Sequence, residues 1–283
     1  MTVAAKRSRL GLWAVGLLLV LTYVPTILWL VHRWSLGVWF HVHGFAVIPI
    51  ALWIAWGAIR KMDGAPHDPS RWGFLFLVPA VLLQVLDAAL KFQLLSAVSL
   101  IIALPGLSLL LLGKARTRAL WFPLLFLGFA LPIPLVVASR IHMMLRQIAA
   151  VSTEHVLSWI GYDVTRERTM LQVGPETLQI ADACSGFSTL MALTMAGLLL
   201  AYMARSRLWR AGLLVCLIFP VAAIANTARC VALCMLVVAF GQDILQTYAH
   251  ELSGFLAFAM ALGLLLASER LLLGKPVDEE KPE

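Results

Sequence analysis

Three residues whose types suit acyl transfer lie in the C-terminal half of the chain. They are Cys184 in ADACSGFSTL, Arg229 in ANTARC and His250 in YAHELSGF. A cysteine thiolate attacks a carbonyl carbon, and a histidine can pair with the thiolate and later protonate the leaving amine. An arginine can orient the substrate or stabilise an oxyanion. The three residue types therefore form a chemically coherent set.

The residues beside the cysteine support this reading. Asp182 and Ser185 can cap the start of a helix next to Cys184. The positive end of a helix dipole lowers the pKa of a cysteine in its first turn and favours the thiolate. We therefore expect Cys184 to be a reactive cysteine.

The arginine and the histidine also have informative neighbours. Asn226 precedes Arg229 by three residues, which places both on one helix face and suggests that this polar face is turned inward. Gly254 follows His250 by one turn and permits close approach of a second helix. Each candidate also has a structural reading: Cys184 as a packed small residue, Arg229 as a side chain extending to headgroups, and His250 as an interface residue.

The other cysteines give no further site. Cys216, Cys230 and Cys234 lie in one apolar run, and the chain has no CxxC pair. We interpret them as packing residues and expect no disulfide framework, metal or cofactor.

The composition excludes a soluble enzyme, a nucleic-acid-binding protein and a disordered chain. Residues of the types AVILMFWYC make up 61% of the 283 residues and charged residues only 13%, whereas globular domains carry about 25% charged residues. The mean hydropathy is +0.89. The net charge of +7 does not indicate nucleic acid, because Lys and Arg of membrane proteins gather in cytoplasmic loops. We expect an all-α polytopic membrane protein with a single integral membrane domain over residues 1–283.

Apolar runs predict about eight transmembrane helices. They cover approximately residues 10–31, 44–59, 72–90, 92–112, 119–138, 185–203, 211–238 and 252–272. The third and fourth runs form one stretch of about 40 residues, too long for a single span, so we predict a tight turn near Lys91. The first run is too long for a signal peptide and lacks a small-residue cleavage site, so we expect it to be retained.

The basic residues predict the orientation. One side of the predicted topology carries five groups of three: Lys6, Arg7, Arg9; Arg60, Lys61, Arg71; Lys114, Arg116, Arg118; Arg205, Arg207, Arg210; and Arg270, Lys275, Lys281. The remaining basic residues are spread over more non-span sequence: Arg33, Lys91, Arg140, Arg146, Arg166, Arg168 and Arg229. By the positive-inside rule, both termini are expected in the cytoplasm of a multi-pass protein.

Residues 139–183 are then expected outside. Their first part mixes apolar and polar residues at near-helical spacing, which favours an amphipathic helix on the outer surface. Their second part has a Gly174-Pro175 break between two β-leaning stretches, which favours a small β-hairpin.

The predicted topology places the three candidate residues at similar depth. At about 1.5 Å of rise per residue, each lies roughly 27–30 Å from the cytoplasmic end of its span. The hydrocarbon core is about 30 Å thick. Cys184, Arg229 and His250 should therefore lie near the outer edge of the membrane, where contact among them is possible.

The sequence resembles the exosortase/archaeosortase family of membrane cysteine transpeptidases over most of its length. The resemblance rests on ACSG at 183–186, which includes Ser185 and Gly186, on NTAR at 226–229 and on HELSG at 250–254, in that order and separated by whole spans. Weaker similarities are FHVHGFAVIPIALW at 40–53 and FPLLFLGFALPIP at 122–134. Many members carry a basic residue shortly after the CSG glycine, where this chain has Phe187 and Ser188.

The resemblance implies Cys184 as nucleophile, Arg229 as its electrostatic partner and His250 as acid and base. It also implies a substrate class: exported proteins that end in a short motif of the PEP-CTERM type, a transmembrane helix and a basic tail. The enzyme would cleave near the motif at the outer face of the cytoplasmic membrane, among membrane lipids. It would pass the acyl group to an acceptor, a lipid or a glycan.

Two other classes of function stay open. One is a different membrane enzyme, either a simple intramembrane hydrolase or an acyltransferase. The other is a non-enzymatic component of a polysaccharide export system, in which Arg229 and His250 would be structural. Products separate the enzymes, because transpeptidation joins substrate to acceptor and hydrolysis leaves a free carboxylate.

Overall fold

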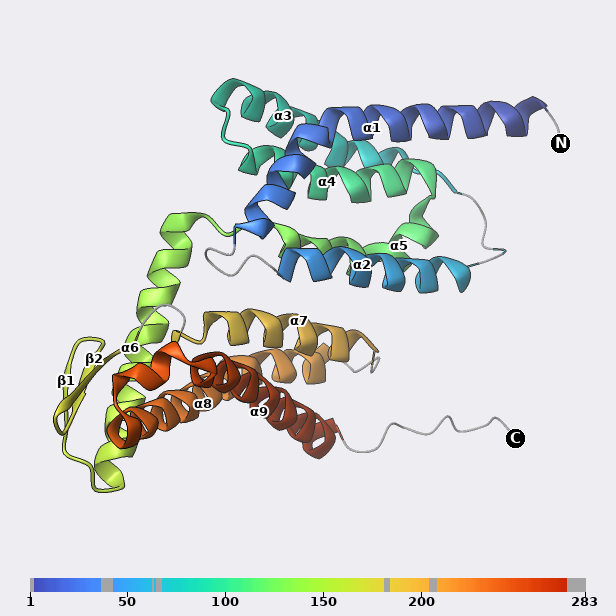
Figure 1. Cartoon of the computed structure of the whole chain (residues 1–283). Coiled ribbons are helices and arrows are strands. Elements are labelled where there is room, and N and C mark those ends of the chain that lie inside the picture. The colour runs from blue at the N-terminus through green and yellow to red at the C-terminus, as the bar shows by residue number, and fades with distance from the viewer. Residues whose placement is uncertain are drawn as a thin grey trace, which may run out of the picture. The chain divides into compact units, whose positions relative to one another are not determined.

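The structure, a computed structural model, describes residues 3–36, 43–62, 64, 68–180, 184–203 and 208–273, with the backbone alone for 3–15, 208, 272 and 273 (Figure 1). Contacts between residues divide the chain into two compact units, Met1–Ile133 and Pro134–Glu283. Each unit is described by itself. The single membrane domain expected over residues 1–283 stays a prediction.

The regular secondary structure of unit 1 is helical in its described part, apart from one β-bridge between Asp68 and Gly113. Its elements are α1 (Val3–Ser35), α2 (His43–Arg60), η2 (Arg71–Gly73), α3 (Phe74–Leu90), α4 (Leu94–Leu111), α5 (Lys114–Phe126) and η3 (Leu127–Ala130). The helices α3 and α4 form an antiparallel pair, α1 packs on α4, and α2 packs on α5. Helices are the expected solution here, because a helix satisfies its own backbone polar groups in an apolar environment.

Hydroxyl groups join the helices of unit 1. Tyr23 of α1 and Ser99 of α4 share a hydrogen bond of 2.6 Å, and Thr26 of α1 bonds Ser96 of α4. All four side chains are buried. Such bonds connect helices that are apolar on every side.

The tight turn predicted near Lys91 is confirmed. Lys91 and Gln93 have left-handed backbone conformations, with φ of 53° and 59°, and they separate α3 from α4.

The two weaker sequence similarities also meet within this unit, because the ring Nε2 of His43 lies 3.1 Å from the carbonyl oxygen of Phe129. That contact joins α2 to η3.

The run 119–138 is not one helix, and this prediction is wrong. The chain leaves helical conformation at Leu131, with ψ of 132°, and the next helix begins at Leu135. Pro132 and Pro134 explain the break. Proline lacks the N–H that continues a helix, and it pushes the preceding residue toward extended conformation.

Unit 2 contains four long helices and a small sheet. Its elements are α6 (Leu135–Trp159), β1 (Val164–Glu167), β2 (Met170–Val173), β3 (Glu176–Gln179), α7 (Phe187–Met203), α8 (Leu208–Phe240), η5 (Gln242–Gln246) and α9 (Tyr248–Leu273). The helix α8 packs against α6, α7 and α9. It is therefore the element that can bring residues from the other three helices together.

The amphipathic helix predicted after residue 139 is confirmed as α6. Its buried residues recur every three or four positions, as one face of a helix requires: Ala138, His142, Leu145, Ala149, Ala150, Thr153 and Leu157. Its location on the outer membrane surface stays a prediction.

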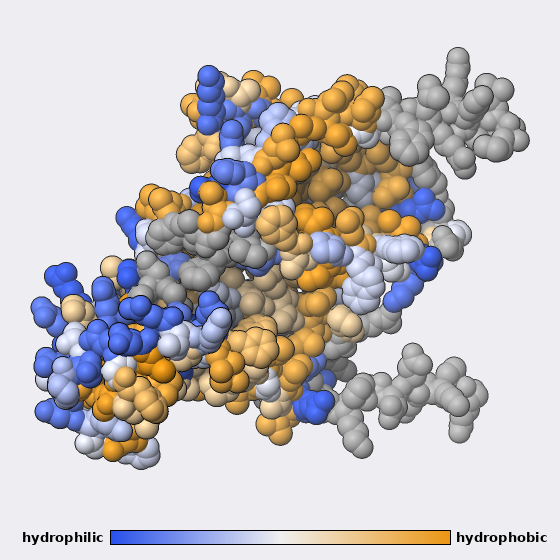
Figure 2. Space-filling view, viewed as in Figure 1, coloured by the Kyte–Doolittle hydropathy of each residue, from blue (hydrophilic) through white to orange (hydrophobic). Residues whose placement is uncertain are grey.

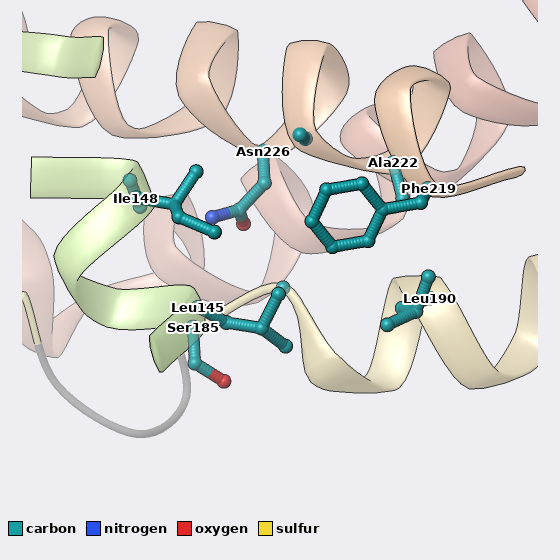
Figure 3. A pocket seen from close by; sticks show the side chains of 10 residues that line it. Leu145, Ile148, Ser185, Leu190, Phe219, Ala222 and Asn226 are labelled. Atoms are coloured by element: carbon teal, nitrogen blue, oxygen red, sulfur yellow. The ribbon is translucent and has the colours of Figure 1, made fainter. Parts of the chain in front are cut away.

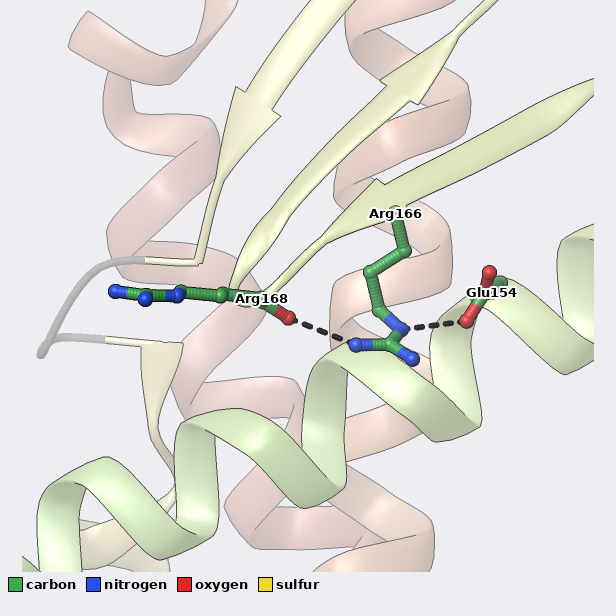
Figure 4. A network of polar contacts seen from close by, with 3 residues as sticks. All are labelled: Glu154, Arg166 and Arg168. Carbon is green, nitrogen blue, oxygen red and sulfur yellow. Dashed lines mark hydrogen bonds and ion pairs between the residues drawn. The ribbon is translucent and has the colours of Figure 1, made fainter.

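The predicted hairpin is also present, within a sheet of three antiparallel strands in the order β1-β2-β3. Gly174 and Pro175 form the turn between β2 and β3, where Val173 pairs with Glu176. Side chains alternate across a strand, so Leu171 and Leu178 point into a core shared with α6 and α8 while Gln172 and Thr177 are exposed. An ion pair between Arg166 of β1 and Glu154 of α6 joins the sheet to the helix (Figure 4).

The helices are apolar enough for a multi-pass membrane protein. Among the described residues, six helices have the length and composition to cross a membrane, or seven if the bent pair 114–130 and 135–159 is one span. The helix α7 has 17 residues, or about 26 Å at 1.5 Å per residue. Hydrophilic residues gather around the sheet of unit 2, and apolar residues cover the helices (Figure 2). The count of eight spans and the cytoplasmic termini stay predictions.

Candidate active site

A three-residue turn, Cys184 to Gly186, leads into α7. Gly186 has φ of +79°, and a Cβ placed on it would lie 2.7 Å from Cγ of Asn226. Glycine is therefore required both for the backbone conformation and for the close approach of α8. The hydroxyl of Ser185 accepts a hydrogen bond of 3.3 Å from the N–H of Phe187. This bond satisfies one of the N–H groups left free at a helix start, as expected for Ser185.

Asn226 of α8 holds the main chain of this turn. Its Nδ2 donates a hydrogen bond of 2.9 Å to the carbonyl oxygen of Cys184. The side chain is 4% exposed, and a hydrogen bond in such a buried setting is costly to lose. The polar helix face expected at this residue is therefore turned inward, toward Cys184.

His250 lies in the first turn of α9 and reaches the cysteine. Its Nδ1 lies 3.9 Å from Sγ of Cys184, a contact at the long end of hydrogen bonds to sulfur. Cys184 is 8% exposed, and His250 is partly buried. The two side chains can therefore exchange a proton once the contact shortens, as catalytic hydrogen bonds commonly do when substrate binds.

Arg229 of α8 bonds to the same turn of α9. Its Nε donates to Oγ of Ser253 at 3.1 Å, and its Nη2 donates to the carbonyl oxygen of His250 at 3.2 Å. The hydroxyl of Ser253 donates to that same carbonyl at 2.7 Å. A Cβ on Gly254 would lie 3.3 Å from Nη2 of Arg229, so Gly254 leaves room for the guanidinium. The reading of Arg229 as extending only to headgroups does not fit these contacts.

Burial controls the protonation of the nucleophile. It raises the pKa of the Cys184 thiol above its ordinary value, and the Arg229 guanidinium lowers the pKa by a smaller amount. Cys184 precedes the first residue of α7 by three positions. The net pKa is therefore raised, because removal of water from the thiolate outweighs the charge of Arg229.

A small pocket lies behind the turn, between α6, α7 and α8. Leu145, Ile148, Leu190 and Phe219 give it apolar walls, while Ser185 and Asn226 supply polar groups (Figure 3). The pocket has room for about one water molecule. The pocket is therefore too small for a substrate side chain of ordinary size.

His142 of α6 was not singled out by the sequence reasoning. Its Nδ1 lies 2.9 Å from Oγ of Ser185, and its ring lies 4.4 Å from that of Phe187. The side chain is 1% exposed. His142 lies four residues after Ala138 and three before Leu145, which places it on the apolar face of the helix. This spacing is the sequence signal that could have identified it. His142 therefore supports the turn that carries Cys184.

The structure thus brings together most of the predicted site residues: Cys184, Ser185, Gly186, Asn226, Arg229, His250 and Gly254. Asp182 lies outside the described residues. Cys230 and Cys234 belong to the buried core, whereas Cys216 is exposed on α8. Within the ranges that the structure describes, no cluster of three His, Cys, Asp or Glu residues could hold a metal ion.

Comparison with protein families identifies a related family. The family model for transmembrane exosortases, Exosortase_EpsH, matches residues 38–267. This range includes all three motifs of unit 2 and both weaker similarities, 40–53 and 122–134. No curated protein and no solved structure gives a match.

Proposed function

Because the chain belongs to the transmembrane exosortase family, whose members are generally cysteine-type transpeptidases, we propose that it cleaves the C-terminal sorting signals of exported proteins. It then transfers the new C-terminus to an acceptor. The signal consists of a short motif, a transmembrane helix and a basic tail. The acceptor is a lipid or a glycan.

The contact between Cys184 and His250 is the observation that carries this proposal. Their 3.9 Å separation joins a thiol to a base, and Arg229 bonds the backbone of that histidine. A nucleophile within reach of a base, with the base fixed by a third group, is the general arrangement of covalent catalysis. The arrangement supports acyl transfer through a thioester.

The first half of the reaction uses Cys184 and His250. As Sγ attacks the carbonyl carbon of the cleaved peptide bond, Nδ1 of His250 takes the thiol proton. Proton transfer during attack suits a thiol whose pKa is raised by burial. Collapse of the tetrahedral adduct breaks the C–N bond, His250 returns the proton to the leaving amine, and the acyl group remains on Cys184 as a thioester.

The second half restores the enzyme. A hydroxyl or amine of the acceptor attacks the thioester carbon, and His250 takes its proton. Breaking of the C–S bond then releases the joined product, and the proton returns to Sγ of Cys184. Arg229 supplies positive charge beside these atoms, as its effect on the Cys184 thiol indicates, and so favours the thiolate and the oxyanion.

The site faces the extracytoplasmic side of the cytoplasmic membrane in this proposal. The distribution of basic residues supports that side. The substrate helix would then lie beside the enzyme with its basic tail in the cytoplasm, and its motif would meet Cys184 near the outer surface.

The test is co-expression of the enzyme with an exported protein that carries such a signal. Cys184→Ala should abolish processing while the enzyme remains at its normal level on a blot, because one small residue replaces another. Cys216→Ala is the matched control, since Cys216 is an exposed cysteine of α8, and it should keep most activity. Wild-type processing by Cys184→Ala would refute the cysteine mechanism.

The products distinguish the open alternatives. Mass spectrometry of the mature substrate should find its C-terminus joined to an acceptor. A free carboxylate at every cleaved terminus would assign the protein as a hydrolase.

A further inference from the structure

The two edges of the small sheet differ in their surroundings. At the β1 edge, Nε of Arg166 lies 2.5 Å from a carboxylate oxygen of Glu154 on α6, and its Nη1 donates to the carbonyl oxygen of Arg168 at 3.2 Å (Figure 4). This edge is tied to α6. The opposite edge is β3, the strand that precedes Cys184 in the chain.

Some backbone N–H and C=O groups of β3 point away from β2, at the edge of the sheet. The N–H of Ile180 donates to the carbonyl oxygen of Thr169 at 2.9 Å, on the side that faces β2. Because successive residues of a strand direct their backbone groups to opposite sides, Leu178 also faces β2, whereas Thr177 and Gln179 face away. Nε2 of Gln242 donates to the carbonyl oxygen of Thr177 at 3.1 Å, which agrees with this assignment.

Some backbone groups along this edge of β3 make no hydrogen bond to the described residues. The N–H of Thr177 and both backbone groups of Gln179 have no hydrogen-bond partner within the part of the chain that the structure describes. Both residues are exposed, while Leu178 and Ile180 are buried in the core beneath the sheet. An added strand would therefore find free donors at Thr177 and Gln179 and a free acceptor at Gln179.

The free edge is connected to the candidate active site by two short chain segments. Gln179 is five residues before Cys184, a distance of at most about 18 Å for an extended chain. Gln242, which bonds the same edge, belongs to η5, the segment between α8 and the helix that carries His250. A peptide along β3 is therefore directed toward the residues that would cleave it.

We propose that the outer edge of β3 binds the substrate segment immediately N-terminal to the cleaved bond, as an added fourth strand. The inference rests on the proposed function, which supplies an exported protein as substrate. Addition of a strand to a free edge obtains its affinity from main-chain hydrogen bonds. The ligand is therefore an extended peptide, and alternate side chains of that peptide contact the exposed face of the sheet.

The added strand runs parallel to β3. In the proposed orientation, β3 leads through Cys184 into α7, from the outer side into the membrane. The substrate segment leads through its cleaved bond into its own transmembrane helix in the same sense. Two chains that enter the membrane side by side in the same direction must pair in parallel.

Disulfide crosslinking tests this pairing directly. In a Cys184→Ala background, which holds substrate without turnover, Gln179→Cys and then Thr177→Cys are combined with single cysteines along the substrate segment. Neighbouring strands place every second residue on the same face. The expected crosslinks therefore alternate along the substrate and move by two positions, toward its N-terminus, when the enzyme cysteine moves from residue 179 to 177.

The β1 edge supplies matched controls. Thr165 pairs with Gln172, which pairs with Thr177, and Glu167 pairs with Met170, which pairs with Gln179. Thr165→Cys and Glu167→Cys therefore occupy the same rows of the exposed face at the other edge, and they should give no crosslinks. Equal crosslinking at both edges, none at β3, or a pattern without alternation would overturn the inference.

Processing provides a second measurement. Gln179→Pro removes the outward N–H without breaking a bond to β2, whereas Gln179→Ala keeps it and should therefore have the lower apparent KM of the two. The loss of this one bond predicts that the apparent KM of Gln179→Pro exceeds that of Gln179→Ala by about three- to tenfold. Equal activity of the two variants would count against the added strand. These results are independent of the Cys184→Ala test, whose failure would instead refute the proposed function.

Discussion

Arg229 of α8 donates a hydrogen bond of 3.2 Å from Nη2 to the carbonyl oxygen of His250 on α9. The arginine therefore has two effects that a sequence motif does not separate. Its charge lowers the pKa of the Cys184 thiol against the effect of burial, and its donors fix the turn that carries the histidine. A substitution at this position should disturb both the charge and the geometry.

We predict that Arg229→Lys loses at least about tenfold in substrate processing, because lysine is a point charge without a planar fork of donors. Arg229→Ala should lose essentially all processing. Processing in cells is measured with enzyme level checked by blot. Near-normal activity of the lysine variant would assign Arg229 a structural role and leave Cys184 and His250 as a dyad.

Ser253→Ala separates the geometric effect from the charge. The variant removes the partner of Arg229 Nε and one of the donors to the His250 carbonyl while it retains the guanidinium. We expect a loss of roughly tenfold, in line with the loss of one hydrogen bond to a charged group and smaller than the loss in Arg229→Ala. A loss as large as that of Arg229→Ala in the same processing assay would contradict a separate role for the charge.

Gly186→Ala should abolish or severely reduce processing. The left-handed conformation costs a non-glycine residue roughly 1–2 kcal/mol, and the new Cβ would collide with Asn226 at 2.7 Å. Gly161→Ala is the matched control, because Gly161 also has a positive φ, of +95°, but nothing lies within 4 Å of its added Cβ. If both variants lost equal activity, backbone strain alone would explain the effect.

The pH dependence of cysteine alkylation should show the raised pKa of Cys184. Thiolates react and thiols do not, so the rate with iodoacetamide should rise with pH through a midpoint above that of an ordinary cysteine. Removal of the positive charge in Arg229→Gln should move the midpoint to still higher pH, because Arg229 lowers the pKa. Labelling is followed at Cys184 by mass spectrometry, and a midpoint below the ordinary pKa would contradict the dominance of burial.

The predicted topology is testable with a membrane-impermeant maleimide. In a Cys216→Ala background, Thr177→Cys should react in cells whose outer barrier admits the reagent, because Thr177 is exposed on the sheet. Ala115→Cys, exposed at the start of α5, should react only after permeabilisation. Labelling of residue 115 from outside would reverse the orientation.

Local patterns in the sequence determined the helical class and most element positions. Apolar runs of span length, the turn at Lys91 and the Gly174-Pro175 break all act over a few neighbouring residues, and each appears where it was expected. The prediction of one helix over 119–138 is wrong because it relied on apolar content alone. The two prolines at 132 and 134 end the helix although the run is apolar.

The catalytic candidates were identified from residue type, order and estimated depth. Depth could place Cys184, Arg229 and His250 at one level but could not decide which helices are neighbours. The packing of α8 against α6, α7 and α9 decided that, since side chains from separate helices meet only where those helices touch. The same packing produced the contact of His142 with Ser185, which no linear motif contains.

The protonation of Cys184 was decided by tertiary structure alone. The sequence shows a cysteine beside a helix start, and that local field favours the thiolate. Its pKa is nevertheless raised, because residues of α6, α8 and the sheet surround it and remove water. Desolvation depends on every neighbour in space, so the sequence determined which residue carries the thiol, and the fold determined how readily that thiol ionises.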